Sequence, residues 1–361
     1  MTRSRRQSNA SAINKAATIR QVAEQAGVST ATVSRVLSGA SRVSDELIKR
    51  VTTAAEKLNY HPNRTARGLR TQRSYTAALI IPDIENPFFT SIARGVEQIL
   101  RAEGYSLILT NSDEDHRIEM QHLMQLHADG IAGVILAPTS QDARKYEQLV
   151  EAGMNLVAID RIPRKLRADS VSVNNQDAIY QATQHLYEMG HRHIGFISGL
   201  PNVSTARERR QGFDQAIKDL GITTLPEWIQ QGNFRQEDGF AAMNRILQLE
   251  NRPTAVITAN NMMTLGALKA IYQNKLVIPD DIAIVGFDDV EWAGSLNPPL
   301  TVIAQPTREL GQAAARLLLG RIKRRDMPYH YVVLNTQLIV RDSSGPHKSH
   351  SEAGAAQAIF D

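Results

Sequence analysis

The chain has 361 residues, 42% of them hydrophobic and 22% charged, which is typical of a globular protein, and it has no run of 18 apolar residues and no signal-peptide pattern, so we expect no membrane segment. It has no cysteine, which excludes disulfides, thiolate metal sites and a cysteine nucleophile and makes a reducing, cytoplasmic setting the expected one. The net charge of +4 is unevenly distributed, because residues 1–75 carry 14 Lys and Arg against four Asp and Glu, whereas the other 286 residues carry 27 against 33. A cationic segment that binds a polyanion, joined to an acidic body, is therefore predicted.

Residues 1–16 are polar and basic and are predicted to form a disordered tail. Residues 17–62 have helical periodicity throughout. Thr18, Ser29 and Ser44 each stand where a helical stretch begins, and a hydroxyl at that position caps the free N–H groups of a helix. Three helices are therefore predicted, which argues against the alternative that the basic segment is only an unstructured tail.

The first two predicted helices have the spacing of a helix-turn-helix. Ala23 is small enough to let a partner helix approach closely, and Gly27 tolerates the positive φ that the turn requires. Val33 then packs into the joint between the helices. Together with a third amphipathic helix and the basic charge, this spacing predicts a DNA-binding domain in residues 17–62.

The second helix is expected to enter the major groove and present Thr30, Ala31 and Arg35 to base edges. Arg35 can donate two hydrogen bonds to guanine O6 and N7, and Ala31 can contact a thymine methyl group. Phosphate contacts are expected from small donors and cations nearby, although the hydroxyls among them also have helix capping as a role: Thr18, Ser29, Thr32, Ser34, Arg42, Ser44 and Asn63.

The stretch from Thr18 to Leu69, with VSTATVSRVLSG and LNYHPNRTARGLR, resembles the head of the LacI/GalR family of bacterial transcriptional repressors. The resemblance implies a hinge helix or linker in residues 63–73. It also implies that the hinge helices of two subunits enter the minor groove at Ala66, Arg67 and Leu69, where Leu69 wedges apart a central base step. The alternative for Leu69 is an ordinary linker residue.

A helix from about Asn63 to Arg70 that contains Gly68 is too short to persist by itself. We therefore expect the hinge to be disordered off DNA and to fold on binding.

From residue 74 the pattern changes to short apolar runs that alternate with helical stretches, which predicts parallel sheets covered by helices. About 270 residues of this pattern exceed one ordinary unit, so two subdomains are expected in a core of residues 74–343. The Pro298–Pro299 pair and a strand-rich end at Tyr331–Val340 indicate that the chain crosses between them more than once. The strand-like runs are Ala77–Pro82, Ser106–Thr110, Gly133–Ala137, Leu156–Asp160, Ile194–Ser198, Ala255–Ala259 and Ile282–Phe287.

This body resembles the effector-binding and dimerisation core of the same family, whose two-lobed α/β fold is like that of periplasmic binding proteins. The matching segments in order are PDIENPFF, GHRHIGFISG, ARERRQGF, TANNMMTLGAL and IPDDIAIVGFDD. Asn261 departs from the pattern, since many relatives carry Asp there. The expected fold is thus an all-α three-helix head followed by a two-lobed core with parallel sheets.

Ligands of such sheets bind beyond the C-terminal ends of the strands, in the cleft between lobes. The resemblance implies that four polar side chains hydrogen-bond the effector, namely Asp160, Arg209, Asn260 and Asp288. It also implies that the rings of Phe88, Phe89 and Phe234 contact sugar C–H groups, and each of these rings has a competing role in the core. Arg161 and Arg209 together could favour a sugar acid or phosphate, whereas a solvated or salt-bridged Arg161 would not. The expected effector residues are Phe88, Phe89, Asp160, Arg161, Arg209, Phe234, Asn260 and Asp288.

The sequence thus predicts a repressor that binds a double-stranded, pseudo-palindromic operator as a homodimer and responds to a sugar, sugar acid or sugar phosphate, with no cofactor or metal. A tetramer is disfavoured because residues 344–361, a predicted disordered tail, lack leucine heptads. An activator or dual regulator of the same family is an alternative. A sugar-binding protein or an enzyme is another, but the dinucleotide, phosphate-loop and nucleophile-elbow motifs of α/β enzymes are missing.

Overall fold

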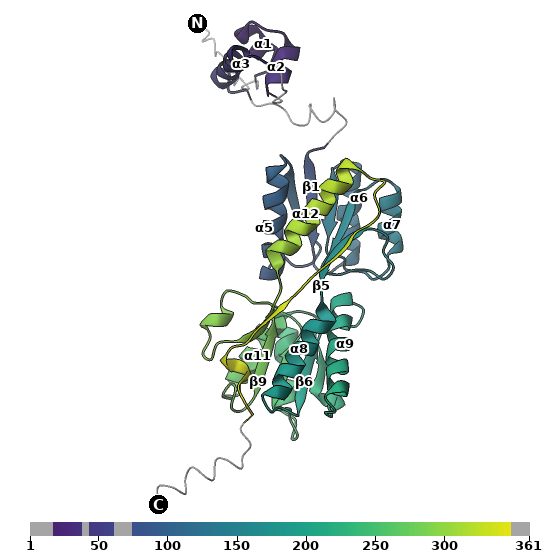
Figure 1. The fold of residues 1–361 in the computed structure, drawn as a ribbon, viewed down its shortest axis with the longest axis vertical. Coiled ribbons are helices and arrows are strands. Elements are labelled where there is room, and N and C mark those ends of the chain that lie inside the picture. Colours follow the sequence, from purple (N-terminus) through teal and green to yellow (C-terminus); the bar gives the residue numbers. More distant parts are fainter. Residues whose placement is uncertain (1–16, 38–42, 61–73, 348–361) are drawn as a thin grey trace, which may run out of the picture. The chain divides into compact units, whose positions relative to one another are not determined.

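The computed structural model describes residues 17–37, 43–60 and 74–347, which divide into two compact units, one ending at Ser74 and the other beginning at Tyr75 (Figure 1). The predicted hinge at 63–73 and the predicted tail at 1–16 lie outside the described residues. The described part of the first unit contains the three expected helices, α1 (Ile19–Ala26), α2 (Thr30–Leu37) and α3 (Asp45–Lys57).

Two local signals in the sequence place α1 and the turn after it. The Thr18 hydroxyl accepts from the backbone N–H of Gln21 at 3.4 Å, and the Gln21 side chain accepts from the backbone N–H of Thr18 at 2.8 Å. Gly27 has a φ of 62° and ends the helix in the left-handed region. Arg50 of α3 donates to the carbonyl oxygen of Ala26 at 2.7 Å, which fastens this turn to the third helix.

The core of the head consists of small and branched side chains at the predicted positions. Val22, Val33 and Val51 are fully buried, one from each helix, and Ala23 is buried in the same cluster. The predicted Ala23–Gly27–Val33 spacing is therefore confirmed. Ser44 stands at the N-cap of α3, but its side chain makes no capping hydrogen bond, so the capping role suggested for it is wrong.

The first lobe of the core is a six-stranded, all-parallel sheet in the order β11-β5-β4-β3-β1-β2. Alternate side chains of β1 enter different cores: Leu79 packs with α5 and α12, and Ile80 packs with α6 and α7. The elements are β1 (Thr76–Ile81), α5 (Pro87–Ala102), β2 (Ser106–Asn111), α6 (His116–Ala128), β3 (Gly133–Leu136), α7 (Arg144–Glu151), β4 (Leu156–Ile159), β5 (Asp169–Val173), α12 (Thr307–Lys323) and β11 (Tyr331–Leu334).

The second lobe is a six-stranded sheet in the order β12-β10-β9-β8-β6-β7, in which β12 alone is antiparallel to its neighbour. Helices α10 and α11 touch so closely that a methyl group at Gly266 would overlap the carbonyl oxygen of Gln236. The elements are α8 (Asn175–Glu188), β6 (Ile194–Ser198), α9 (Ser204–Asp219), β7 (Ile229–Gln231), α10 (Gln236–Leu247), β8 (Ala255–Thr258), α11 (Asn261–Gln273), β9 (Ala283–Phe287), β10 (Thr301–Ala304) and β12 (Gln337–Ile339), with 3₁₀ turns at Pro226–Trp228, Ala293–Ser295 and Asp342–Ser344.

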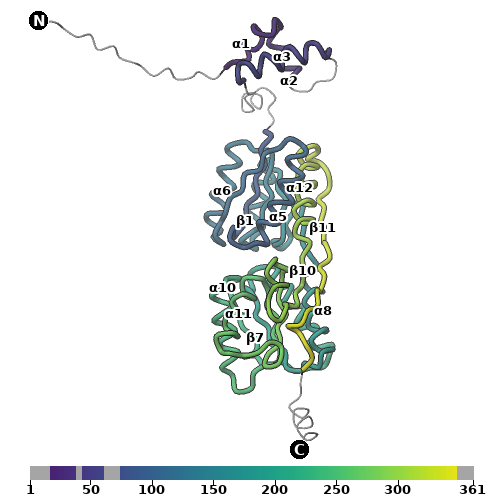
Figure 2. The backbone as a smooth tube through the Cα atoms, turned by 90° about the vertical axis from the view of Figure 1, so that its left-hand side faces the viewer, coloured from purple at the N-terminus to yellow at the C-terminus, as the bar shows by residue number. Residues whose placement is uncertain are grey.

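The chain passes between the lobes three times, after β5, after β10 and after β11, so the predicted multiple crossing is confirmed (Figures 1 and 2). The last crossing runs along both lobes, from β11 in the first sheet to β12 in the second. Each predicted strand is present to within one residue at either end. Three strands were not predicted, β5, β7 and β10. More than half of the residues of β5 and β7 are polar, whereas β10 is an apolar run like the predicted strands and was predictable.

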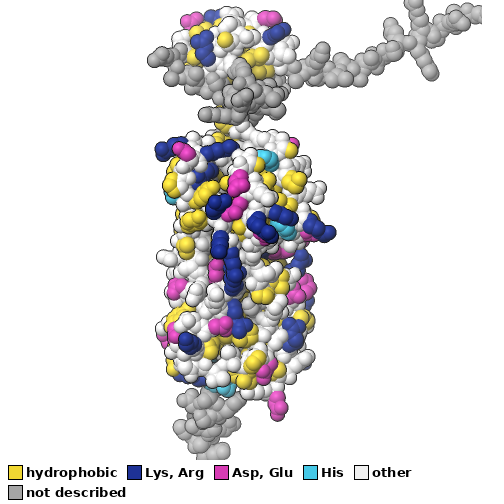
Figure 3. Space-filling model, turned by 90° about the vertical axis from the view of Figure 1, so that its right-hand side faces the viewer, with side chains coloured by type: hydrophobic (Ala, Val, Ile, Leu, Met, Phe, Trp, Pro, Cys, Tyr) yellow, Lys and Arg dark blue, Asp and Glu magenta, His cyan; other side chains and the backbone are white. Residues whose placement is uncertain are grey.

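On the face shown in Figure 3, the core carries Lys and Arg side chains interspersed with Asp and Glu, and its apolar side chains are scattered. Such a mixed surface is typical of a face in contact with solvent. Within the described ranges, no helix is both long enough and apolar enough to cross a bilayer.

The tail was predicted to begin at residue 344, but the described residues 344–347 are part of the second lobe. Ser344 is 1% exposed and its hydroxyl lies 2.8 Å from His185 Nε2. The backbone N–H of His347 donates to the carbonyl oxygen of Met189 at 2.9 Å. Residues 344–347 thus pack against the core, although their polar sequence resembles a tail, because the polar groups bond to partners far away in the sequence.

Acidification is expected to weaken the packing of residues 344–347 against the second lobe. His191 is buried, Nε2 donates to the carbonyl oxygen of Gly345 at 3.1 Å, and burial lowers the pKa of His191 to about 4. The unfolded chain, with an ordinary histidine pKa, takes up the proton first, so stability is lost as pH falls from about 6.5 towards 4. Between about pH 7.5 and pH 5 the loss from His191 is about 2 kcal/mol.

Urea unfolding followed by tryptophan fluorescence at the two pH values measures this loss. The His191→Gln variant should show a pH dependence smaller by that amount, whereas the exposed His193→Gln control should behave as the wild type does. Equal pH dependence of wild type and His191→Gln would contradict the assignment.

Candidate functional site

Helix α2 presents the three residues predicted to read bases. Thr30, Ala31 and Arg35 are all exposed on this helix. Arg35 lies one turn after Ala31, and its Nε is 3.5 Å from the Ala31 carbonyl oxygen. The structure therefore places a guanidinium, a methyl group and a hydroxyl on one helix surface, as base readout in a major groove requires.

Around α2, the predicted phosphate-contacting hydroxyls are accessible to different extents. Thr18, Ser29 and Ser44 are exposed, and Thr32 and Ser34 are half-buried. The Ser29 hydroxyl accepts from the backbone N–H of Thr32 at 3.2 Å, so Ser29 caps α2, as predicted. The remaining predicted DNA contacts lie outside the described residues: Arg42, Asn63, Ala66, Arg67 and Leu69.

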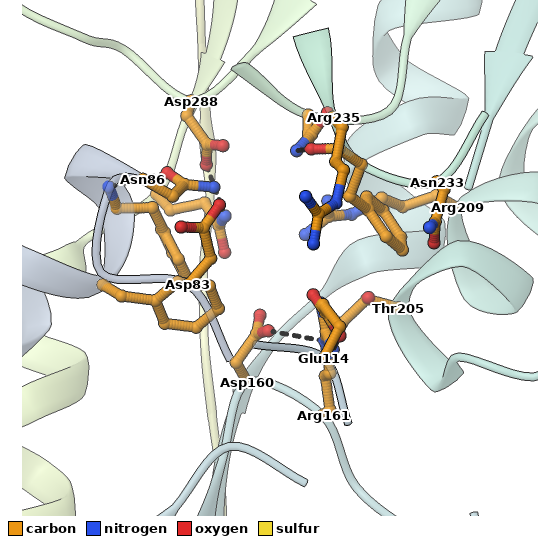
Figure 4. Close-up of a pocket in the computed structure, with 15 residues that line it drawn as sticks. Asp83, Asn86, Glu114, Asp160, Arg161, Thr205, Arg209, Asn233, Arg235 and Asp288 are labelled. Atoms are coloured by element: carbon orange, nitrogen blue, oxygen red, sulfur yellow. Dashed lines mark hydrogen bonds and ion pairs between the residues drawn. The ribbon is translucent and has the colours of Figure 1, made fainter. Parts of the chain in front are cut away.

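The core contains a pocket beyond the C-terminal ends of strands from both lobes (Figure 4). It lies where parallel strands of α/β sheets place their ligands. Every one of the residues predicted from the sequence to bind an effector lines it: Phe88, Phe89, Asp160, Arg161, Arg209, Phe234, Asn260 and Asp288.

Three of these side chains are directed by strained backbone. Asp160 follows β4 with a φ of 64°, Asp288 follows β9 with a φ of 71°, and Phe234 follows β7 with a φ of 61°. Positive φ is unfavourable for residues other than glycine and is tolerated where the surrounding structure holds it in place. The strand ends thus turn sharply and aim a carboxylate, a ring and a second carboxylate at the pocket.

Arg161 is engaged by carboxylates. Its two terminal nitrogens donate to the two oxygens of Glu114 at 2.5 and 2.7 Å, and its Nε lies 3.7 Å from Asp160. Although burial disfavours a charged Arg161, the Glu114 carboxylate more than compensates, and the pKa of Arg161 is raised. Of the alternatives drawn from the sequence, the salt-bridged Arg161 is the correct one, so this residue adds no free positive charge to the pocket.

Arg209 is almost completely buried behind the pocket. It donates to Asn175 Oδ1 at 2.8 Å and to the carbonyl oxygen of Ala259 at 2.6 Å, and its guanidinium stacks 3.6 Å above the Phe287 ring. Burial lowers its pKa, and the nearby carboxylates of Asp160 and Asp288 oppose this effect. Arg209 therefore holds the second lobe's side of the pocket in place and supplies a fixed positive field.

The two central carboxylates are also buried. Burial raises the pKa of Asp160 to about 6 and raises that of Asp288, while Arg209 lowers both. Asp288 accepts from Gln305 at 2.6 Å and from the backbone N–H of Asn261 at 3.3 Å. Hydrogen bonds donated to an ionised carboxylate lower its pKa, so a raised pKa indicates that the protein leaves part of this stabilisation unsupplied. Ligand hydroxyls can donate the missing hydrogen bonds.

Asn260 is held by the protein itself. Its side chain caps α11 by accepting from Met263 at 2.9 Å and donates to the carbonyl oxygen of Phe234 at 3.0 Å. The next residue, Asn261, donates to Asn86 Oδ1 at 2.8 Å and thereby connects the second lobe to the first. An Asp at position 261 could not donate this hydrogen bond.

The aromatic residues contribute both to the core and to the pocket, the two roles expected from the sequence. Phe88 and Phe89 pack edge to face with centroids 4.9 Å apart and belong to the core of the first lobe, yet both reach the pocket. Phe234 lies 5.4 Å from the Arg161 guanidinium across the pocket.

Comparisons with known proteins agree with this architecture. "Bacterial regulatory proteins, lacI family" matches residues 18–63, and "Periplasmic binding protein-like domain" matches residues 183–344. The chain is 35% identical to the HTH-type transcriptional repressor PurR of Mannheimia succiniciproducens over 328 residues, covering 91% of this chain and 98% of the relative. The chain belongs to the LacI family of bacterial transcriptional repressors.

Two solved structures of similar proteins extend the comparison. The lac repressor dimer bound to operator and the anti-inducer ONPF superposes with a TM-score of 0.83 at 27% identity, covering 92% of this chain and all of that one. The complex of the transcriptional regulator CelR with cellobiose gives 0.70 at 32% identity and covers 91% and 99%. As a LacI-family repressor, the chain is not an enzyme.

Sequence reasoning missed about half of the residues that line the pocket of this LacI-family chain. Asp83, Asn86 and Thr205 lie in or beside the segments that carried the resemblance and could have been found there. The others follow β2, β7 or β10 in polar loops without a distinctive pattern, so only the fold identifies them. The missed residues are Asp83, Asn86, Glu114, Thr205, Asn233, Arg235 and Gln305.

Proposed function

We propose that this LacI-family repressor binds a pseudo-palindromic operator as a dimer and that a small hydroxylated effector in the core pocket changes its operator affinity. The observation that carries this proposal is the convergence of Asp160, Asp288 and Arg209 on one pocket lined by both lobes. Carboxylates that accept from neighbouring hydroxyls, beside aromatic rings, are suited to a sugar or a sugar derivative. The likeness to the CelR–cellobiose complex supports the same ligand class.

The DNA-binding part of the proposal depends on α2 in the major groove and on a second copy of the chain. The lac repressor that this chain resembles is a dimer on its operator. Two heads on one dimer match two half-sites of a pseudo-palindrome. Exposed Ile108 and Leu109 on the outer strand β2 are candidates for part of the dimer surface. Sedimentation velocity of the full chain tests the assembly, and a species of one chain only would contradict it.

The coupling between the sites is proposed to run through the angle between the lobes. Two hydrogen bonds join the lobes beside the pocket, Asn261 to Asn86 at 2.8 Å and the backbone N–H of Ile162 to the Ser204 hydroxyl at 3.0 Å. An effector that favours one lobe angle shifts the separation of the hinges, and a difference of about 1–3 kcal/mol is the usual range of such coupling.

A thermal-shift screen of sugars, sugar acids and sugar phosphates, followed by operator titration with each ligand found, tests the proposal. A ligand that both stabilises the core and changes operator affinity is expected. If ligands stabilise the protein without any effect on operator binding, the allosteric part is wrong.

A flat heteroaromatic base is the second candidate effector, because the rings of Phe88 and Phe234 both line the pocket. Nucleobases belong in the same screen. Stabilisation by a base but by no sugar would favour this second class.

Truncating Leu69 to Ala is expected to weaken operator binding by roughly 10-fold or more while leaving binding to unrelated DNA nearly unchanged, because wedging matters only on a duplex bent at the specific site. Fluorescence anisotropy with both DNAs at one salt concentration measures the two affinities. An equal loss on both would assign Leu69 an ordinary linker role. Hydrogen exchange of the hinge amides with and without operator tests the accompanying disorder-to-order change.

A further inference from the structure

This inference depends on the proposed function and concerns the charge of the effector. The pocket has basic side chains from three positions, Arg161, Arg209 and Arg235. Arg161 is paired with Glu114 through two hydrogen bonds. Arg209 is 3% exposed and fully directed at Asn175, the carbonyl oxygen of Ala259 and the Phe287 ring. Both cations therefore have partners before any ligand arrives.

Arg235 is different. It is exposed, it lines the pocket, and none of the described residues forms a side-chain hydrogen bond or an ion pair with its guanidinium. It directly follows Phe234, whose φ of 61° turns the chain, and it precedes α10 without capping it through its side chain. Figure 4 shows the Arg235 guanidinium directed into the space between the pocket walls.

The surroundings of Arg235 can complete a site for an anion. Figure 4 shows Thr205 and Asn233 on the same side of the pocket, where they offer a hydroxyl and an amide. Glu237 and Asp238, in the first turn of α10, do not line the pocket. The carboxylates of Asp83, Asp160 and Asp288 come from other strand ends, and Figure 4 shows them on the side facing Arg235.

We propose that Arg235 binds an acidic group of the effector, and that the effector is therefore a polyhydroxylated acid, a sugar acid or a sugar phosphate. A guanidinium matches a carboxylate or phosphate through two parallel hydrogen bonds. The hydroxyls of the same ligand are directed to Asp160 and Asp288. The acidic effector considered from the sequence thus depends on Arg235 and not on Arg161, whose charge Glu114 already balances.

The test compares matched ligands on matched variants of the full chain. The ligand pairs are glucose with glucuronate and glucose 6-phosphate, galactose with galacturonate, and ribose with ribose 5-phosphate. The variants are Arg235→Met, which keeps an unbranched stem like that of arginine but removes the guanidinium and its charge, and Arg210→Met. Arg210 is on α9, pairs with Asp214 at 2.8 Å and does not line the pocket.

At least one acidic ligand is expected to stabilise the wild type more than its neutral counterpart does. Calorimetry should show that Arg235→Met lowers the affinity for this acidic ligand by roughly 10- to 100-fold, the usual effect of losing a charge-assisted pair. Arg210→Met should bind the ligand with the affinity of the wild type. Binding of the acid and the neutral sugar with equal affinity, or an unchanged acid affinity in Arg235→Met, would overturn the inference and leave the proposed function standing. If no ligand of either kind binds the wild type or alters its operator affinity, the proposal of a hydroxylated effector itself fails.

Discussion

Replacing Arg35 by Ala is expected to lower affinity for the operator by roughly 10- to 100-fold, while affinity for unrelated DNA falls only slightly. Arg35 is exposed on α2 one turn from Ala31, and a guanidinium there can donate two hydrogen bonds to one guanine, worth about 1–3 kcal/mol of discrimination. Binding to unrelated DNA depends on the total charge of the head, of which Arg35 is one of many contributors. The operator is first obtained by selection from random duplexes with the wild-type chain.

Arg35→Lys is the matched control, since it keeps the charge and loses the two-pronged geometry. It should bind unrelated DNA as the wild type does but lose most of the operator preference, specifically at one base pair of each half-site. Fluorescence anisotropy at several salt concentrations separates the two effects. If Arg35→Ala weakens both DNAs equally, Arg35 contacts phosphate and another residue of α2 reads the base.

Replacing Asp288 by Ala is expected to abolish the effector response and to leave operator binding within a few-fold of wild type. Asp288 lies at the end of β9, accepts from Gln305 and Asn261, and faces the pocket. Its loss removes a carboxylate acceptor and a counter-charge for Arg209, so the effector concentration needed for half the response should rise by at least roughly 100-fold. Effector titrations of a preformed operator complex measure it.

The fold should survive this change, which keeps the result interpretable. Burial raises the pKa of Asp288, so its charge is already unfavourable in the folded protein. Asp288→Asn keeps the shape and should also lose the response. Asp289→Asn is the control, because Asp289 pairs with Arg341 at 2.9 Å and does not line the pocket. A normal response in Asp288→Ala would remove this residue from the effector site.

The head was predictable because its signals are local. The Thr18 capping box, the Ser29 cap, Gly27 at positive φ and Ala23 at the helix crossing each depend on residues within a few positions of one another. Ser44 shows the limit of such signals, since the residue stands at the N-cap but its side chain makes no capping hydrogen bond. The core strands were predictable for the same reason, because buried parallel strands are uninterrupted apolar runs.

The sequence alone therefore determined the basic head, the α/β core, the family and the residue types that end the strands. Only the tertiary structure decided what those residues do together. It paired Arg161 with Glu114, joined Asn261 to Asn86 across the lobes, held residues 344–347 against the core and left Arg235 without a described partner. The physical reason is that caps and periodicity act between neighbours, whereas the charge of a pocket is a sum over strand ends brought together by topology, and one distant carboxylate changes it.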